Sequence, residues 1–323
     1  MRTARRHLLA AAALSALAPR PLRAQGFPAR PIKLLVGFAP GGATDIAARL
    51  LQPLLGEALS QPVVVENRSG GGGNVATDLL VHAEPDGYTL MLASPGQLVV
   101  NPLLDPKFAF DAARDATAIG QTTRSPLVLV VPANSPYRDA RALIDAARAR
   151  PGTMNYASAG VGSSMHIAGE MLKAYGGLDI THVPYRGSGP AITDLVAGGV
   201  DFMIDSVSTT TPAIRNGLLR ALAQTGAEPF REMPEVPLLK DTVPGVVITT
   251  WLGLVGPARL PAPVVARLSD ALRGAVQGPV FPARMKDLGS QASWAGPADF
   301  AAQLAAERQR TAEVIRRAGI RLE

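Results

Sequence analysis

Residues 31–45 read Pro-Ile-Lys-Leu-Leu-Val-Gly-Phe-Ala-Pro-Gly-Gly-Ala-Thr-Asp, and this stretch decides the fold class. An apolar run, predicted as a strand over Ile32–Phe38, passes through a Gly-Gly turn into a helix predicted near residues 44–59. A continuous apolar strand followed at once by a helix is typical of parallel sheets that helices cover on both faces. The sequence therefore predicts an α/β protein.

The same alternation of short apolar runs and helical patterns recurs along the chain. Further strands are predicted at Val63–Glu66, Thr89–Ala93, Leu127–Val131, Met154–Ala157, Ile180–Val183, Asp201–Ile204 and Leu219–Ala223, and further helices near 74–83, 137–149, 164–175 and 188–197. From Pro263 onward the pattern is helical, near 263–276, 279–288 and 297–318, and we expect no strand between these helices.

The first 24 residues have the layout of an export signal. A basic start with Arg2, Arg5 and Arg6 precedes an apolar stretch of 11 residues, Leu8–Ala18, which is too short to span a bilayer. The Arg5-Arg6 pair fits a twin-arginine signal as well as an ordinary Sec signal, so both routes stay open. With no cysteine in the chain, a lipid-anchored N-terminus and disulfides are excluded. We expect a periplasmic protein without stable membrane insertion.

Most of the positive charge of the chain lies in this leader. The chain has 32 Lys+Arg and 26 Asp+Glu, and the leader holds five arginines and no acid, which leaves 27 basic against 26 acidic residues. A net charge of +1 supplies no basic stripe, so nucleic-acid binding is excluded. The 299 residues that remain of 323 after the leader predict two domains.

Two extended stretches, Thr122–Pro136 and Thr249–Pro257, are candidate crossings between these domains. If both cross, residues 26–124 plus 250–323 form the first lobe, and residues 125–249 form the second. Two sequential domains would give much the same pattern, so the division is an expectation only.

Two loops rich in glycine and hydroxyl residues, Gly37–Asp45 and Tyr156–His166, each join a predicted strand to a predicted helix. Free N–H groups and the partial positive charge of a helix N-terminus suit an anion such as a carboxylate. Ordinary N-caps, Thr44 or Asp45 in the first loop and a serine in the second, would give similar patterns. The pairing of two such loops, one in each expected lobe, favours a ligand site. Since neither loop contains Arg or Lys, we expect backbone N–H groups to carry the recognition.

Other motifs give weaker or negative signals. The Gly70–Gly73 run lacks the Gly-Lys-Ser/Thr ending of a P-loop, so we expect a flexible turn capped by Asn74. The three histidines outside the leader, His82, His166 and His182, have no recognised metal-ligand spacing, so no metal site is expected.

A hydrolytic triad of Ser163, His166 and Asp205 is conceivable. However, Gly-x-Ser-x-Gly is absent, and capping at a helix start explains Ser163 and His166 equally well. Asp205 and Arg186 each follow a predicted strand, where a helix cap and an exposed turn are as plausible as a place in a cleft. We therefore expect a protein that is not an enzyme.

Ordered motifs over nearly the whole mature chain resemble the Bug, or TctC-like, extracytoplasmic solute receptors of tripartite tricarboxylate transporters. The matching segments are, in chain order, residues 31–45, Pro62–Arg68, Pro85–Leu90, Asn101–Pro102, Pro151–Gly152 with Tyr156–Ser158, His182–Gly187, and Gly217 with Leu219–Leu222. Their number and order make the resemblance specific.

The resemblance implies an α/β, two-lobed periplasmic binding protein of type II-like architecture. Each lobe would be a mostly parallel sheet flanked by helices, with the ligand cleft between the lobes. The loops of residues 38–45 and 158–166 would hold a ligand carboxylate, and two further positions match the family's cleft. The candidate ligand-binding residues are Phe38, Ala39, Gly41, Gly42, Asp45, Ser94, Ser158, Gly160, Val161, Gly162, Ser163, His166 and Asp205.

By the same resemblance, the protein would capture a small organic carboxylate and present it to membrane permease subunits. We expect a monomer that needs no cofactor. The resemblance leaves the identity of the carboxylate open. Two other interpretations remain at this point: a periplasmic hydrolase that uses Ser163 and His166, and a ligand receptor for a membrane sensor.

Overall fold

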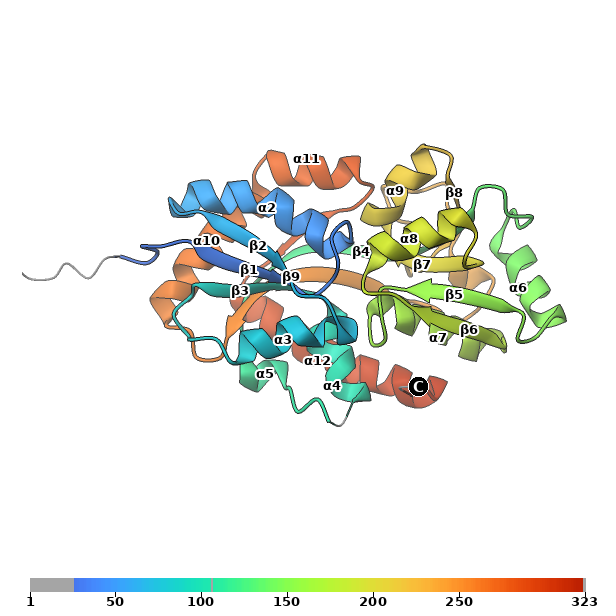
Figure 1. Ribbon diagram of the computed structural model, residues 1–323, viewed down its shortest axis with the longest axis horizontal. Coiled ribbons are helices and arrows are strands. Elements are labelled where there is room, and N and C mark those ends of the chain that lie inside the picture. The colour runs from blue at the N-terminus through green and yellow to red at the C-terminus, as the bar shows by residue number, and fades with distance from the viewer. Residues whose placement is uncertain (1–25, 106, 322–323) are drawn as a thin grey trace, which may run out of the picture.

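In a computed structural model of the chain, which describes residues 26–105 and 107–321, ten strands form one mixed sheet (Figure 1). The predicted export segment, residues 1–24, lies outside the described residues. The strands are β1 (Ile32–Val36), β2 (Val63–Asn67), β3 (Thr89–Ala93), β4 (Ala116–Pro132), β5 (Met154–Ser158), β6 (Ile180–Pro184), β7 (Phe202–Ser206), β8 (Leu219–Gln224), β9 (Thr249–Pro257) and β10 (Ala292–Ala295).

The sheet is parallel toward both ends and antiparallel in the middle. Its order is β2–β1–β3–β9–β4–β7–β5–β6, and β8 and β10 also pair with β4. β1 pairs in parallel with β2 and β3, as does β5 with β6 and β7, whereas β4 and β9 are antiparallel to every neighbour. The expected α/β fold is confirmed, with a mixed sheet that is parallel only in its outer parts.

Two strands join the two halves of the molecule. β4 is 17 residues long; its residues from Ala116 to Pro126 pair with β9, and its residues from Leu127 onward pair with β7 and β8. We call the part built on β1–β3, β9 and β10 the first lobe and the part built on β5–β8 the second lobe. In Figure 1 these lobes lie on the left and right, and β4 and β9 run between them.

Helices cover both faces of the sheet in each lobe. They are α2 (Ala43–Leu59), α3 (Asn74–Val81), α4 (Asn101–Leu104), α5 (Ala112–Asp115), α6 (Ala140–Ala149), α7 (Ser164–Gly176), α8 (Ser188–Ala197), α9 (Val207–Arg215), α10 (Ala262–Gln277), α11 (Val280–Asp287) and α12 (Pro297–Ala318). Successive strand residues enter different cores: Leu34 packs with α2 and α10, whereas Leu35 packs with α3 and α12. Because both faces are covered, a strand such as β3, with the sequence Thr-Leu-Met-Leu-Ala, is almost continuously apolar.

The C-terminal helix α12 contacts both lobes. Phe300 and Leu304 are buried in the first lobe, whereas Val314 and Ile315 pack on the core of the second lobe. The indole Nε1 of Trp251 on β9 donates a hydrogen bond of 2.7 Å to Glu307 of this helix. In Figure 1, α12 lies beneath both lobes, and the C-terminus is below the second. The end of the chain therefore packs differently from the expected division, which places residues 250–323 in the first lobe alone.

Our expectation that no strand lies between the C-terminal helices is wrong. β10 lies between α11 and α12 and pairs antiparallel with β4. The Gln121 amide on β4 donates to the Ser293 hydroxyl at 2.8 Å, which fastens the short strand. A four-residue strand whose partner lies far away in the sequence has no periodicity of its own to reveal it.

In the part of the chain that the structure describes, no helix combines the length and the apolar character needed to cross a membrane.

Candidate functional site

A cavity between the lobes lies where four helices begin. Its walls include Gly42, Ala43 and Thr44 at the start of α2, and Ser163, Ser164 and Met165 at the start of α7. They also include Ser188 at the start of α8, and Ser206, Val207 and Ser208 at the start of α9. One helix belongs to the first lobe and three belong to the second. The cavity volume is about 40 Å³, which has room for a few water molecules.

The first N–H groups of a helix have no partner within the helix, and they make its N-terminus partly positive. No side chain caps α2, α8 or α9, whereas the Ser163 hydroxyl caps α7 by accepting a hydrogen bond of 3.2 Å from the His166 backbone N–H. Four helix dipoles thus point their positive ends at one small volume. Such a volume favours a negatively charged group.

Hydroxyl groups dominate the rest of the wall. Ser94 follows β3, Thr123 and Ser125 lie on β4, and Thr250 lies on β9. No Arg, Lys, Asp or Glu is among the described residues that line the cavity. More than half of the lining residues are serine or threonine. An anion in the cavity would therefore meet backbone N–H groups and hydroxyls, and no cationic side chain.

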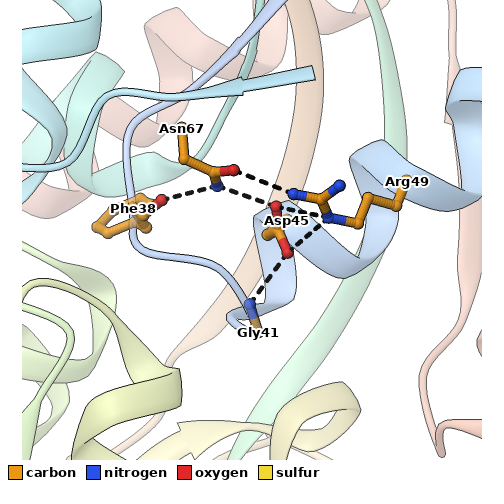
Figure 2. A network of polar contacts seen from close by, with 5 residues as sticks. All are labelled: Phe38, Gly41, Asp45, Arg49 and Asn67. Atoms are coloured by element: carbon orange, nitrogen blue, oxygen red, sulfur yellow. Dashed lines mark hydrogen bonds and ion pairs between the residues drawn. The ribbon is translucent and has the colours of Figure 1, made fainter. Parts of the chain in front are cut away.

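Asp45 holds the first loop in place through the polar contacts shown in Figure 2, and it is not among the residues that line the cavity. Its carboxylate accepts hydrogen bonds from the Gly41 N–H at 3.0 Å, from Arg49 Nε at 3.0 Å and from Asn67 Nδ2 at 2.9 Å. Asn67 Nδ2 also donates to the Phe38 carbonyl at 3.0 Å. Burial alone would raise the pKa of Asp45, but the hydrogen bonds and the charge of Arg49 hold that pKa below its ordinary value. Asp45 therefore positions the loop from Phe38 to Gly42.

The second loop is held by two stacked histidine rings. The His166 and His182 rings lie 4.3 Å apart, and the Ser158 hydroxyl lies 2.7 Å from His182 Nε2. The Gly162 N–H donates to His166 Nδ1 at 3.1 Å, so this ring nitrogen is an acceptor. Burial, aided by the charge of Lys173, lowers the pKa of His166 to about 4, and the ring is neutral at pH 7.

The hydrogen bonds do not form the conceivable hydrolytic triad. The Ser163 hydroxyl accepts from the His166 backbone, and His166 Nδ1 accepts from the Gly162 N–H, so neither ring nitrogen is bonded to that hydroxyl among the described contacts. The Asp205 carboxylate bonds to Ser188, Ser206 and Thr209 instead of His166. No cluster of His, Cys, Asp and Glu suited to a metal ion occurs among the described residues.

Asp205 lies directly behind the cavity wall and is fully buried. Its Oδ1 accepts from the Ser206 N–H at 2.7 Å and from the Ser188 hydroxyl at 2.9 Å, and its Oδ2 lies 3.0 Å from the Thr209 hydroxyl. Burial raises the pKa of Asp205 to about 6, although these hydrogen bonds oppose the shift. The carboxyl group thus acts on the cavity through Ser188 and Ser206, which line it.

The lobes touch each other through backbone at the rim of the cavity. The Ala39 N–H of the first lobe donates to the Arg186 carbonyl of the second at 2.9 Å. A Cβ placed on Gly72 would lie 2.0 Å from the Val161 carbonyl oxygen. The glycine run therefore serves close contact between the lobes. Asn74 does not cap α3 as expected, because it is the first residue of that helix and accepts a hydrogen bond from Asn101 instead.

Four of the predicted ligand-binding residues line the cavity: Phe38, Gly42, Ser94 and Ser163. The others surround it within the two loops or behind the wall, and these are Ala39, Gly41, Asp45, Ser158, Gly160, Val161, Gly162, His166 and Asp205. Ser188, the first residue of α8, and Ser206, the residue before α9, line the cavity but are not among the residues predicted to bind the ligand. The signal that identified the first two loops, small or hydroxyl residues between a strand and a helix, is present in both segments.

Two lobes that share a mixed sheet and enclose a cavity between them define the fold of a periplasmic binding protein. The sequence profile described as tripartite tricarboxylate transporter family receptor matches residues 47–320, and the chain belongs to this family. The resemblance found in the sequence is thereby confirmed.

Relatives match over nearly the full chain. The UPF0065 protein in the tcbD-tcbE intergenic region of Pseudomonas sp. strain P51 is 39% identical over 315 residues, which cover 96% of this chain and 94% of that protein. Rpa4515 of R. palustris, solved with adipate, is 31% identical with a TM-score of 0.88 and coverages of 91% and 99%. MatC of Rhodopseudomonas palustris, solved with malate, is 32% identical with a TM-score of 0.85 and coverages of 90% and 100%.

Replacing Asp45 by Asn should destabilise the protein. The carboxylate has a lowered pKa, so its hydrogen bonds stabilise the fold at neutral pH, and that contribution is lost as the pH falls through the folded-state pKa. We expect urea unfolding at pH 7 to show a loss of about 1–3 kcal/mol, which shrinks below about pH 4. The control is Asp270→Asn, which removes an exposed ion pair with Arg273 and should cost less than about 1 kcal/mol. Equal losses in the two variants would contradict the role of Asp45.

Replacing Asp205 by Asn should have the opposite effect at pH 7. A carboxyl group whose pKa rises on folding contributes its full stability only below the unfolded pKa of about 4, and it loses that stability as the pH rises through about 6. The amide resembles the protonated acid, so the variant should be more stable than wild type by about 1–3 kcal/mol at pH 7. The gain should vanish near pH 4 in matched urea titrations. A variant less stable than wild type at pH 7 would show that the ionised carboxylate stabilises the fold.

Proposed function

We propose that this chain is a periplasmic receptor that binds a small organic carboxylate between its lobes and presents it to membrane permease subunits. The observation that carries the proposal is the convergence of the N-termini of α2, α7, α8 and α9 on one cavity whose described lining has no charged side chain. Adipate and malate in the related structures support the same chemical class of ligand. Residues 1–24 would direct export by the Sec or the twin-arginine route.

Binding would close the lobes on the ligand. A carboxylate touched by α2 from one lobe and by the helices of the other binds the closed form more tightly than the open form, and this difference shifts the population. Closure also excludes water, which strengthens the attraction between the anion and the helix N-termini. Ligand release requires only that the lobes separate. The receptor would act as a monomer and leave its ligand chemically unchanged.

Removing the charge of the ligand carboxylate should abolish tight binding. We expect the fully amidated form of the bound acid, which carries no carboxylate, to bind about 30-fold or more weakly in calorimetry, because charge-assisted hydrogen bonds from the helix N-termini are lost. Mass spectrometry of the small molecule that co-purifies with the mature protein identifies the acid to use.

The matched control is Arg186→Gln, which removes an exposed cation beside the rim and should change affinity by less than about twofold. If the amide binds as tightly as the acid, or if the Arg186 variant loses binding, recognition by backbone N–H groups is disproved.

Replacing Gly72 by Ala should prevent closure. The new Cβ would collide with the Val161 carbonyl oxygen across the rim, and Gly72 also has a φ of +61°. Gly177→Ala is a matched control, because Gly177 has the same φ of +61° and a Cβ added there would meet nothing within 4 Å. Both variants should lose about 1 kcal/mol of stability from backbone strain.

Only Gly72→Ala should lower ligand affinity, by about 10-fold or more, and abolish the ligand-induced decrease in the radius of gyration seen by solution scattering. Unchanged affinity in the Gly72 variant would mean that ligand binding does not use the lobe contact.

A further inference from the structure

Ser188 differs from the other hydroxyl residues of the cavity in having a buried carboxyl group behind it. It lines the cavity at the start of α8, and only 2% of its surface is exposed. Its hydroxyl donates to Asp205 Oδ1 at 2.9 Å. Asp205 has no exposed surface, so the acceptor belongs to the protein interior and water does not compete for it.

The proton of the Ser188 hydroxyl is committed to Asp205 in either protonation state of the acid. Asp205 Oδ1 also accepts from the Ser206 backbone N–H at 2.7 Å, which favours Oδ1 as the carbonyl oxygen when the acid is protonated. A proton on the acid would lie on Oδ2, opposite the Thr209 hydroxyl at 3.0 Å. Thr209 can accept it there when its own proton is directed at the Ser206 carbonyl, which lies 2.7 Å away.

A hydroxyl group has one proton and two lone pairs. With its proton given to Asp205, the Ser188 oxygen offers only lone pairs to a ligand. A carboxylate oxygen or a methylene group next to the Ser188 oxygen leaves its lone pairs without a hydrogen-bond donor. An alcohol or an ammonium group in the same place supplies that donor. Ser163 has the opposite polarity, because its oxygen accepts from the His166 backbone and its proton stays available for a carboxylate.

We propose that Ser188, oriented by Asp205, forms a subsite for a hydrogen-bond donor on the ligand chain, so that the receptor selects hydroxy- or amino-substituted carboxylates over unsubstituted ones. This inference rests on the proposed function and specifies its ligand class. The helix N-termini bind the carboxylate, and the Ser188 oxygen accepts a hydrogen bond from the substituent. A site built to bond a hydroxyl rejects the analogue that lacks it more strongly than an apolar pocket rejects an extra group.

Matched ligand pairs test the proposal by calorimetry on the mature protein. The pairs are malate with succinate, 2-hydroxyglutarate with glutarate, and lactate with propionate, and aspartate and glutamate supply the amino arm. For each pair that binds, wild type should prefer the substituted acid by about 10-fold or more. Ser188→Ala should bring the ratio to within about twofold.

Two further variants separate orientation from charge. Ser163→Ala should weaken both members of a pair alike and keep their ratio, because its hydroxyl serves the common carboxylate. Asp205→Asn should keep the preference for the hydroxy acids, since an amide oxygen still accepts from Ser188, and should lower the preference for the amino acids, since the negative charge is gone.

The outcomes distinguish this inference from the proposed function. Binding of both members of every pair with equal affinity, or a ratio that Ser188→Ala does not change, overturns the donor subsite alone. Absence of binding by every acid in the panel, together with no carboxylate among co-purified molecules, overturns the proposed function and this inference with it.

Discussion

The antiparallel pairing of β4 with β9 is the interaction on which the rest of the structure depends. β4 pairs with β9 as far as Pro126 and then continues into the second lobe, where it pairs with β7 and β8. Both lobes are therefore extensions of one sheet, and their relative position is set by continuous strands. The parallel strands of each lobe end toward the junction, so the helices that follow them begin there. The convergence of four helix N-termini is a consequence of this topology.

Two buried acids lie close to these N-termini, and they are handled differently. Asp45, in the first turn of α2, is paired with Arg49, and the positive charge of Arg49 offsets the negative charge of Asp45. Asp205, just before α9, accepts hydrogen bonds only from uncharged groups among its described partners. Its burial therefore opposes ionisation, and a second negative charge in the cavity would oppose it further. The site accordingly favours one anionic group at the helix N-termini and a neutral or cationic group near Asp205.

The fold class and the family could be predicted from the sequence, because apolar strands and ordered motifs are local signals. The positions of β10 and of the end of α12 could not, since both depend on partners far away in the chain. The helix α9 was also missed: its sequence, Val-Ser-Thr-Thr-Thr-Pro-Ala-Ile-Arg, combines β-branched residues with a proline, and burial of its first turns outweighs this weak propensity.

The sequence indicated where the candidate site lies, but it did not indicate the role of each residue in it. Two of its four helix N-termini were expected, and the residues within each loop were not separable into those that face the cavity and those that hold the loop. One sequence signal for Asp45 did exist, because Arg49 follows it at i+4, a spacing that brings the two side chains together on a helix. The role of the His166 ring had no such signal, because its partner is the backbone N–H of Gly162, a group that every residue type except proline has.

A wall of small hydroxyl residues has a property that a wall of charged residues lacks. Each hydroxyl can donate or accept, and the partner behind it decides which of the two it offers to the cavity. Ser163 is bonded to a backbone donor and Ser188 to a buried acceptor, so two chemically identical side chains present opposite polarity to the same small volume. A substitution behind the wall, such as one at Asp205, can thus change the ligand that the cavity prefers while the cavity keeps its shape. The backbone N–H groups that bind the carboxylate are therefore separate from the hydroxyl groups that contact the rest of the ligand. Because they are separate, the same backbone framework can accommodate carboxylates with different substituents.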